Sequence, residues 1–290
     1  MSEYWLRFWG TRGSVATPGQ GTVRYGGNTA CVEVRYGTRV LVVDAGTGIR
    51  LLGNCLEQES VRRVDLLISH PHMDHLGGFP FFRPAYQAGV HMDIYLADTV
   101  QSGNGQHTVA EPFLKLMEAP HFPVIFRDLP ADIRFHRLAP ELRLGEMTVR
   151  THAMNHPGGC SAFRLEYRGK VVVYMSDHEP WARALGPTPE NLALDRAALE
   201  FTRGADVLIR EAQYTSEEYP SRRGWGHGTY EDAVADALAA GVRKLTVFHH
   251  DPDHDDAFLD CQLAAIRRQL GQAPLEVTFA QEGERIELIG

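Results

Sequence analysis

The sequence predicts an α/β fold in which two mixed β-sheets pack face to face and helices cover their outer surfaces. Three observations carry this prediction. Several strand-like runs precede the first helical segment, more hairpin-like runs follow it, and strands then alternate with helices toward the end of the chain. A chain of 290 residues with 43% hydrophobic content can bury a large core, as one domain or as two closely fused halves.

The expected strands are short runs rich in β-branched and aromatic residues and bounded by turn residues. They are Trp5–Trp9, Cys31–Tyr36, Arg39–Asp44, Val64–Ser69, Asp93–Ala97, Met147–Ala153, Phe163–Tyr167, Val171–Ser176, Asp206–Ile209 and Leu245–Phe248. Helical spacing of apolar residues is found at Ile49–Gln58, Val109–Glu118, Leu192–Arg203, Thr229–Ala240 and Asp256–Gln269. Residues 98–138 interrupt this order, and their prolines and clustered aromatic residues predict an insertion that acts as a lid or as a subunit contact in a homodimer.

Composition narrows the classes of partner. The net charge is −8 and no run of Lys or Arg occurs, which argues against long nucleic acid as the main partner and favours a small substrate. No window approaches the roughly 20 apolar residues that span a bilayer, and the charged opening lacks a long apolar core, so we expect a cytoplasmic protein. The four cysteines are far apart and unpatterned, which predicts reduced, packed thiols and no thiolate ligand.

The stretch "HPHMDH" after the apolar run Val64–Ile68 is the strongest functional signal. His70 and His72 alternate on an extended turn, so both can face one metal ion, while Asp74 and His75 follow closely enough to face a second. The following Gly77–Pro80 is expected to be a turn that enters a helix. The alternative is a set of surface or capping residues, with Asp74 as an ordinary N-cap.

Further ligands are expected at the ends of later strands. They are His156 in "THAMNHPGG", Asp177 in "VVVYMSDHEP", and His249 or His250 in "LTVFHHDP". Asp177 is suited to bridge two ions, because a carboxylate has two oxygens to share. His152 and His178 are rival candidates, although His152 lies within a strand, where a packed side chain is expected. Because His249 and His250 point to opposite faces of an extended chain, only one of them can readily bind.

This order of histidines and aspartates resembles the metallo-β-lactamase fold, a four-layer αββα sandwich with a dinuclear metal site, and the resemblance covers nearly all of residues 1–290 as a single domain. It implies two groups of ligands joined by a bridging Asp177. The first ion would be held by His70, His72 and His156, and the second by Asp74, His75 and His249. Zinc is the first choice for both ions, while manganese and iron accept the same kinds of ligand.

Two later stretches resemble the phosphodiesterase branch of this fold, typified by ribonuclease Z and the cyclic-phosphate phosphodiesterases. In "ADVLIREAQYT" and "GWGHGTYEDAVADAL", Glu211 follows a strand and is expected to pair with His227 near the start of a helix. Arg210 and Gln213 depart from the pattern of these relatives. The resemblance implies hydrolysis of a small cyclic or linear phosphodiester by a metal-bound hydroxide, with Asp74 in the catalytic centre and His227 as the general acid.

The glycine-rich loop at residues 10–14 has two readings. It is either a tight turn or a nest of main-chain N–H groups with Arg12 near a substrate phosphate, and Asn28 is a second candidate for substrate binding. "DAGTG" at residues 44–48 is expected to be a structural turn beside the metal ligands. Because the fold alone does not fix the reaction, a thioester or lactone hydrolase and a tRNA-processing nuclease remain alternatives.

Overall fold

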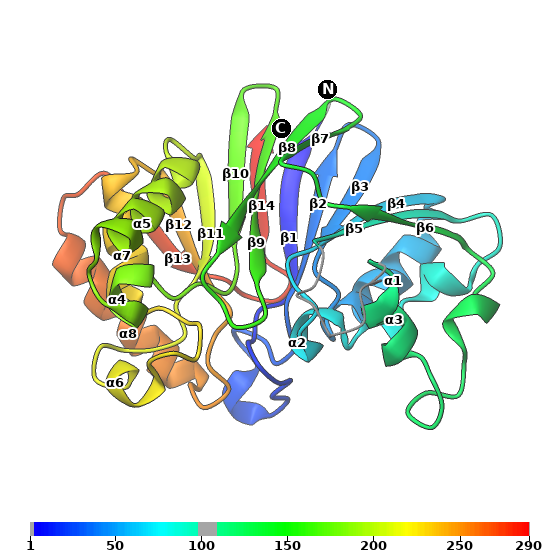
Figure 1. Ribbon diagram of the computed structural model, residues 1–290, viewed down its shortest axis with the longest axis horizontal. Helices are drawn as coiled ribbons and strands as arrows, with labels where there is room; N and C mark the ends of the chain where they lie inside the picture. The colour runs from blue at the N-terminus through cyan, green and yellow to red at the C-terminus, as the bar shows by residue number, and fades with distance from the viewer. Residues whose placement is uncertain (1–2, 98–108, 290) are drawn as a thin grey trace.

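The computed structural model describes residues 3–97 and 109–289, and within them the strands form two mixed sheets of seven strands each. The two sheets face each other and the larger helices lie on their outer sides (Figure 1). In Figure 1, α5, α7 and α8 lie beside one sheet and α1 and α3 beside the other. The predicted sandwich of two mixed sheets flanked by helices is therefore confirmed.

The first sheet has the strand order β14-β1-β2-β3-β4-β5-β6. Its strands are β1 (Tyr4–Gly10), β2 (Cys31–Tyr36), β3 (Arg39–Val43), β4 (Arg63–Ile68), β5 (His91–Leu96), β6 (Asp132–Arg137) and β14 (Arg285–Ile289). Pairing is antiparallel from β14 to β3 and parallel from β3 to β6. The carboxyl ends of β3 and β4 therefore meet at one edge, where the histidine-rich stretch begins.

The second sheet has the order β13-β12-β11-β10-β9-β8-β7. Its strands are β7 (Glu141–Leu144), β8 (Met147–Met154), β9 (Cys160–Tyr167), β10 (Lys170–Met175), β11 (Val207–Glu211), β12 (Lys244–Phe248) and β13 (Glu276–Phe279). Pairing is antiparallel from β7 to β10 and parallel from β10 to β13. The β9–β10 hairpin turns through Arg168 and Gly169, which both have positive φ angles, as a two-residue hairpin loop requires.

The α-helices are α1 (Ile49–Gln58), α2 (Met73–Leu76), α3 (Glu111–Leu116), α4 (Trp181–Leu185), α5 (Pro189–Thr202), α6 (Tyr219–Arg222), α7 (Tyr230–Ala239) and α8 (Asp256–Leu270). Short 3-10 turns are η1 (Gln20–Thr22), η2 (Phe79–Phe81), η3 (Arg83–Tyr86) and η4 (Phe126–Asp128). A capping box fixes the start of α7, because Thr229 and Asp232 each bond the other's main-chain N–H. None of the helices in the described parts of the chain combines the length and apolar character that crossing a membrane requires.

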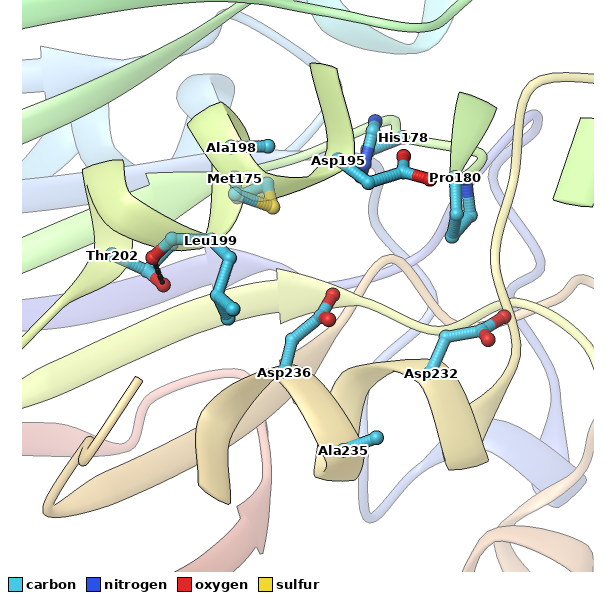
Figure 2. A pocket seen from close by; sticks show the side chains of 10 residues that line it. All are labelled: Met175, His178, Pro180, Asp195, Ala198, Leu199, Thr202, Asp232, Ala235 and Asp236. Atoms are coloured by element: carbon cyan, nitrogen blue, oxygen red, sulfur yellow. Dashed lines mark hydrogen bonds between the residues drawn. The ribbon is translucent and has the colours of Figure 1, made fainter. Parts of the chain in front are cut away.

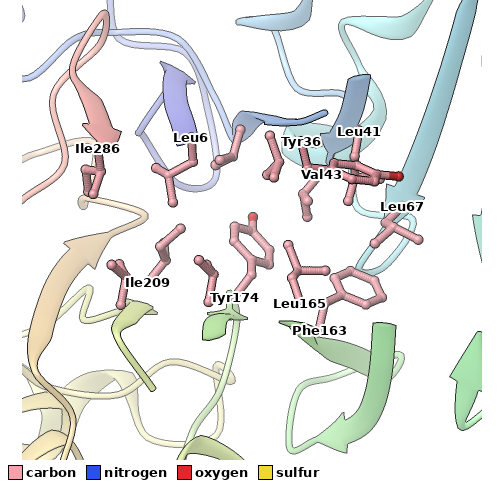
Figure 3. Packing of buried hydrophobic residues seen from close by; sticks show 14 of the residues in the cluster. Leu6, Tyr36, Leu41, Val43, Leu67, Phe163, Leu165, Tyr174, Ile209 and Ile286 are labelled. Carbon is pink, nitrogen blue, oxygen red and sulfur yellow. The ribbon is translucent and has the colours of Figure 1, made fainter. Parts of the chain in front are cut away.

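Three apolar clusters produce the four layers. The cluster between the two sheets joins inward-facing residues such as Leu6 and Val43 of the first sheet to Leu165 and Ile209 of the second (Figure 3). A second cluster packs α1 on the outer face of the first sheet, and a third packs α7 and α8 on the outer face of the second. Both faces of each sheet are therefore buried, which explains why most strands read as continuous apolar runs.

Four strands were not among those expected from the sequence: β6, β7, β13 and β14. β6 lies inside residues 98–138, so part of the expected insertion is an edge strand paired with β5. Residues 98–108 of that segment lie outside the described residues. The part that follows packs inward, because the buried ring of Phe113 lies 4.7 Å from that of Phe79. A lid or subunit-contact role for this segment stays a prediction.

Candidate dinuclear metal centre

The histidine-rich stretch lies at the carboxyl end of β4 and folds differently from the extended turn expected. The chain is extended at the N-cap His72 and then forms the single turn of α2, in which the N–H groups of His75 and Leu76 donate to the His72 carbonyl at 3.0 and 3.1 Å. This helical turn precedes the glycines, whereas the sequence suggested a helix after them. The turn places His70 and His72 on one side and Asp74 and His75 on the other.

The first group of candidate ligands joins this stretch to the second sheet. It consists of His70, His72, His156 and Asp177, and one ligand atom of each lies within 4.8 Å of those of the others. His72 Nδ1 lies 3.0 Å from His156 Nε2, and Asp177 Oδ2 lies 3.4 Å from His70 Nε2. His156 follows β8 and Asp177 follows β10, so this group brings two strands of the second sheet against β4 of the first.

The second group shares Asp177 with the first. Its members are Asp74, His75, Asp177 and His249, and their ligand atoms also lie within 4.8 Å of one another. His249 Nε2 lies 3.0 Å from Asp74 Oδ2 and 3.2 Å from His75 Nε2. All four side chains are buried, so their polar atoms face one another without competition from solvent.

The carboxylate of Asp177 divides its two oxygens between the groups. Its Oδ2 faces His70 at 3.4 Å and His156 at 3.5 Å, while its Oδ1 faces His75 at 3.4 Å and His249 at 3.3 Å. One oxygen is thus directed at each group. This arrangement fits a carboxylate that bridges two cations.

The hydrogen bonds that two of the rings make outside the cluster also fit metal binding. The Nδ1–H groups of His75 and His156 donate to Asp44 Oδ2 at 2.8 Å and to the Gly226 carbonyl at 2.9 Å, so in a neutral ring Nε2 is left as an unprotonated ligand atom directed into the cluster. Nε2 of His70 is buried and has no hydrogen-bond partner within the described residues. Imidazole and carboxylate donors of this kind suit a divalent transition metal.

Electrostatics in the cluster are strongly coupled. Burial on its own would raise the pKa of Asp177, but the facing imidazoles of His249, His75 and His70 hold it well below its usual range. Burial would lower the pKa of His75, but the carboxylates of Asp74, Asp177 and Asp44 raise it well above its usual value. For His70, burial dominates and the pKa is held well below its usual value. The carboxylates around His75 therefore favour positive charge there, whereas burial favours a neutral ring at His70.

Three residues support the candidate ligands although the sequence did not predict such a role for them. Asp44, in the turn considered structural, accepts hydrogen bonds from the Ser69 N–H at 2.7 Å, from the Tyr174 hydroxyl at 2.6 Å and from His75. The Ser14 N–H donates to Asp74 Oδ2 at 2.7 Å. Glu179 accepts the N–H of Gly226, the residue whose carbonyl contacts His156, at 2.9 Å. The only sequence signal was the position of Asp44 at the end of a strand beside β4.

The structure distinguishes the rival histidines by position. His249 enters the cluster because its left-handed backbone, with φ of 59°, breaks the alternation expected of a strand. His250 points away and its Nε2–H donates to the Ala280 carbonyl at 2.9 Å. His152 stacks on Phe201 with ring centroids 5.2 Å apart.

His178, the other rival, lines a cavity of about 140 Å³ between α5 and α7 (Figure 2). Figure 2 shows the carboxylates of Asp195, Asp232 and Asp236 around the same cavity. His178 Nδ1 accepts the Asn155 N–H at 3.3 Å, so this ring supports the chain next to His156 and is not part of the cluster.

Glu211 and His227 lie together beside the cluster. His227 Nδ1 is 3.9 Å from Glu211 Oε2, which is within ion-pair range but too long for the expected hydrogen bond. Glu211 instead accepts the N–H groups of Gly228 at 2.6 Å and Gln213 at 3.1 Å. Burial raises the pKa of Glu211 to about 8 and lowers that of His227 to about 3. The His227 ring is 5.1 Å from that of His156 and 5.3 Å from that of His249.

Arg12 and Asn28, the two residues predicted to bind substrate, make contacts with other loops of the protein. The guanidinium of Arg12 is fully buried and donates to the carbonyls of Gly26 at 2.7 Å and His254 at 2.6 Å, so main-chain oxygens occupy it. The Asn28 side chain donates to Glu282 at 3.0 Å and accepts from the Thr47 hydroxyl at 3.1 Å. These contacts tie loops together and do not direct either side chain at the metal ligands.

Comparisons with known proteins identify the family. The family model described as "Beta-lactamase superfamily domain" matches residues 38–250, which is more than half of the chain. The ribonuclease Z of Pseudomonas putida is 27% identical over 98% of this chain and 96% of its own length. The ribonuclease Z of Brevibacillus brevis is 31% identical over 30% of this chain, and the match spans 23% of that relative's length.

Solved structures agree on the fold. The metallo-β-lactamase fold protein YhfI from Bacillus subtilis superposes with a TM-score of 0.70 at 20% identity, covering 99% of this chain and 100% of that one. A diphosphatase of the PhnP family gives a TM-score of 0.65 at 16% identity, covering 99% and 98% of the two chains. The fold, the two groups of His and Asp side chains and the family model agree: the chain belongs to the β-lactamase superfamily and adopts the metallo-β-lactamase fold.

Proposed function

We propose that the protein is a dinuclear metal-dependent hydrolase that cleaves a small phosphodiester of the cyclic nucleotide or cyclic phosphate type. The observation that carries this proposal is the carboxylate of Asp177, whose two oxygens face two separate groups of ligands at 3.3–3.5 Å. Support for the reaction class comes from the ribonuclease Z relatives. The position of His227 beside both groups supplies a candidate proton donor.

The residues proposed to hold the ions are those of the two groups, with Asp177 shared. His70, His72 and His156 would hold one ion, and Asp74, His75 and His249 the other. Bound divalent ions would supply Lewis acidity, lowering the pKa of water and offsetting negative charge on the phosphodiester. Zinc is the first choice because neutral imidazoles and carboxylates suit it, and manganese and iron accept the same donors.

The protein's own groups would act on the leaving group. An alkoxide is a poor leaving group at neutral pH, so a proton donor next to the departing oxygen accelerates cleavage. His227 lies between His156 and His249, and its Nδ1 has no hydrogen-bond partner within the described residues. Burial lowers its pKa to about 3, so the acid role requires that the negative charge of a bound phosphodiester raise this pKa. Glu211 Oε2 lies 3.9 Å from His227 Nδ1, within ion-pair range.

RNA is the second candidate substrate, because the sequence relatives are ribonucleases Z. A net charge of −8 favours the small substrate, since binding a long nucleic acid depends on neutralising many phosphates. A thioester hydrolase would use the same metal ligands but expels a thiolate, which needs no general acid. The His227 and Glu211 pair therefore favours a phosphodiester over a thioester, whereas a lactone, which also expels an alkoxide, is distinguished by the relatives alone.

The test is metal analysis of the purified protein combined with assays on bis(p-nitrophenyl) phosphate, a nucleoside 2′,3′-cyclic phosphate, a precursor tRNA and a thioester. We expect two ions per chain and faster turnover of the small phosphodiesters than of the tRNA or the thioester. His136→Ala is a matched control, because His136 is a half-buried histidine that pairs with Asp93, lies on the outermost strand β6 of the first sheet and belongs to neither group. Efficient tRNA trimming without cleavage of small diesters would reject the proposal.

A further inference from the structure

Trp225 is an exposed indole next to the metal ligands. It leaves 55% of its surface exposed, although tryptophan is one of the residue types that folded proteins bury most extensively on average. The next residue is Gly226, whose carbonyl accepts the His156 Nδ1–H at 2.9 Å. A Cβ atom at Gly226 would lie 2.3 Å from that same nitrogen, so the chain passes directly against the His156 ring. The residue after Trp225 therefore lies directly against a candidate ligand.

Arg222 lies beside the Trp225 indole. Its guanidinium carbon lies 4.8 Å from the centroid of the Trp225 ring and 5.9 Å from that of Tyr214. No residue within 3–97 or 109–289 forms an ion pair with Arg222. The Tyr214 ring in turn meets the His227 ring edge-on, with centroids 5.9 Å apart. Planar groups thus run without interruption from the exposed indole to the proposed proton donor.

The loop that carries these groups is held in place. Glu179 is buried and accepts hydrogen bonds from the Tyr219 hydroxyl at 2.6 Å and from the N–H groups of Gly224 and Gly226, each at 2.9 Å. A side chain on an anchored loop loses little further freedom when it binds a ligand. The exposure of Trp225 is therefore a property of an ordered part of the chain.

The chemistry of these groups selects a planar, anionic ligand. A base that stacks on an aromatic side chain gains about 1–3 kcal/mol, and this gain depends little on which base is stacked. A guanidinium without an ion-pair partner attracts a phosphate or a ribose-linked anion, and its stacking on Trp225 fixes its orientation. In a chain of net charge −8, this positive group is a local feature and does not belong to a broad basic surface.

We propose that Trp225 stacks on the base of a nucleotide substrate and that Arg222 binds its charged group, so that the substrate is a nucleoside phosphodiester and not a base-free one. This inference rests on the proposed function, because it assigns the substrate of the same centre. A single indole on an anchored loop can stack on one base, which suits a mononucleotide better than a long strand.

The main experiment compares two substrates that share the reacting group. One is adenosine 2′,3′-cyclic phosphate, and the other is methyl riboside 2′,3′-cyclic phosphate, which lacks the base. We expect Trp225→Ala to lower the ratio of kcat/KM for the first over the second by about 5- to 150-fold, the range that loss of one stacked base implies. Trp225→Phe should restore most of the ratio, because a phenyl ring still stacks.

Arg222 is tested in the same assay. Arg222→Ala should raise KM for both substrates, while Arg222→Lys keeps the charge and should recover part of the loss. Arg196→Ala is the matched control, since Arg196 is an exposed arginine on α5 outside this loop. A change in the substrate ratio in the Arg196 variant equal to that in the Trp225 variant would show a non-specific effect and overturn the inference.

A binding measurement separates this inference from the proposed function. Calorimetry with adenosine 3′-monophosphate reports nucleotide binding whether or not the protein cleaves any diester. Weaker binding in Trp225→Ala than in Trp225→Phe supports the site even if turnover fails, whereas absence of cleavage in the unaltered protein counts against the proposed function alone. Equal nucleotide affinity in all variants overturns the site, and so does a change in subunit number on loss of the indole, which would make Trp225 a subunit contact.

Discussion

The carboxylate of Glu179 accepts the N–H of Gly226 at 2.9 Å, and the carbonyl of the same glycine accepts the Nδ1–H of His156 at 2.9 Å. A buried acid two residues after Asp177 thus orients a candidate ligand that follows another strand. The contact passes through a single residue, Gly226, so a change at Glu179 is expected to displace His156 without touching it.

Glu179→Gln is expected to lower metal affinity by about 10- to 100-fold, the usual effect of losing a group that orients a ligand. The amide NH2 of glutamine would face main-chain N–H groups that now meet carboxylate oxygens, so the loop from Tyr219 to Gly226 shifts. Competition titration with a chelating indicator measures the affinity. Glu200→Gln on α5, which changes an exposed acid paired with Arg203, serves as the control. Unchanged affinity in the Glu179 variant would limit this acid to stabilising the fold.

Alanine substitutions in the two groups are expected to remove different ions. His72→Ala should lose the ion of the first group, His249→Ala that of the second, and Asp177→Ala both, because only Asp177 faces both groups. Elemental analysis of the purified variants gives the number of ions per chain, and activity should fall in each of them. Loss of the same single ion in the His72 and His249 variants would contradict two separate sites.

His227→Ala is expected to keep both ions but lose turnover in a way that depends on the leaving group. If His227 donates a proton, the loss should be on the order of 10²–10⁴-fold for a strongly basic sugar alkoxide and small for p-nitrophenolate, which leaves without help. Glu211→Gln should show a weaker form of the same pattern. The measurement is kcat for an alkyl and an aryl phosphodiester at equal metal content. Equal losses of kcat for both substrates would show that His227 has a structural role and does not donate a proton.

Gly13→Ala is expected to displace His249, since a Cβ atom there would lie 2.3 Å from its Nδ1. His249 is a candidate ligand of the second group only, so this variant should bind the second ion at least 10-fold more weakly while the first group keeps its affinity. Gly19→Ala in the same loop is the control, because a Cβ at Gly19 meets no atom within 4 Å. Metal titrations of both variants make the comparison, and equal behaviour would show that His249 tolerates movement or does not bind.

The sequence predicted the strands with strong apolar signals and missed the polar or short ones. Cys31–Tyr36 and Ile49–Gln58 match β2 and α1 residue for residue, because continuous burial or helical spacing marks them clearly. β6 alternates exposed and half-buried residues at a sheet edge, and β13 has four residues. Such segments gain their structure from a neighbouring strand, which the local sequence does not reveal.

The sequence predicted the parts of the candidate site in which the residue type itself indicates metal binding. It did not predict the parts in which contacts between distant residues determine where a side chain lies. The ligand residues themselves were proposed from the sequence, and the structure brings seven of them together in two overlapping groups. The placement of Arg12 depends on the carbonyls of Asp251 and His254, more than 200 positions away in the chain, so its burial could not be anticipated. Glu179 gave no signal, because its partners are main-chain N–H groups of a later loop.

The candidate ligands are divided between the two halves of the chain. Residues 70–75 follow a strand of the first sheet, whereas His156, Asp177 and His249 follow strands of the second. A chain that has paired only strands β1 to β6 holds half of each group, because the other members follow strands of the second sheet. Tight metal capture would therefore require that the two sheets have docked, so metal content can serve as an assay for chains that have finished folding.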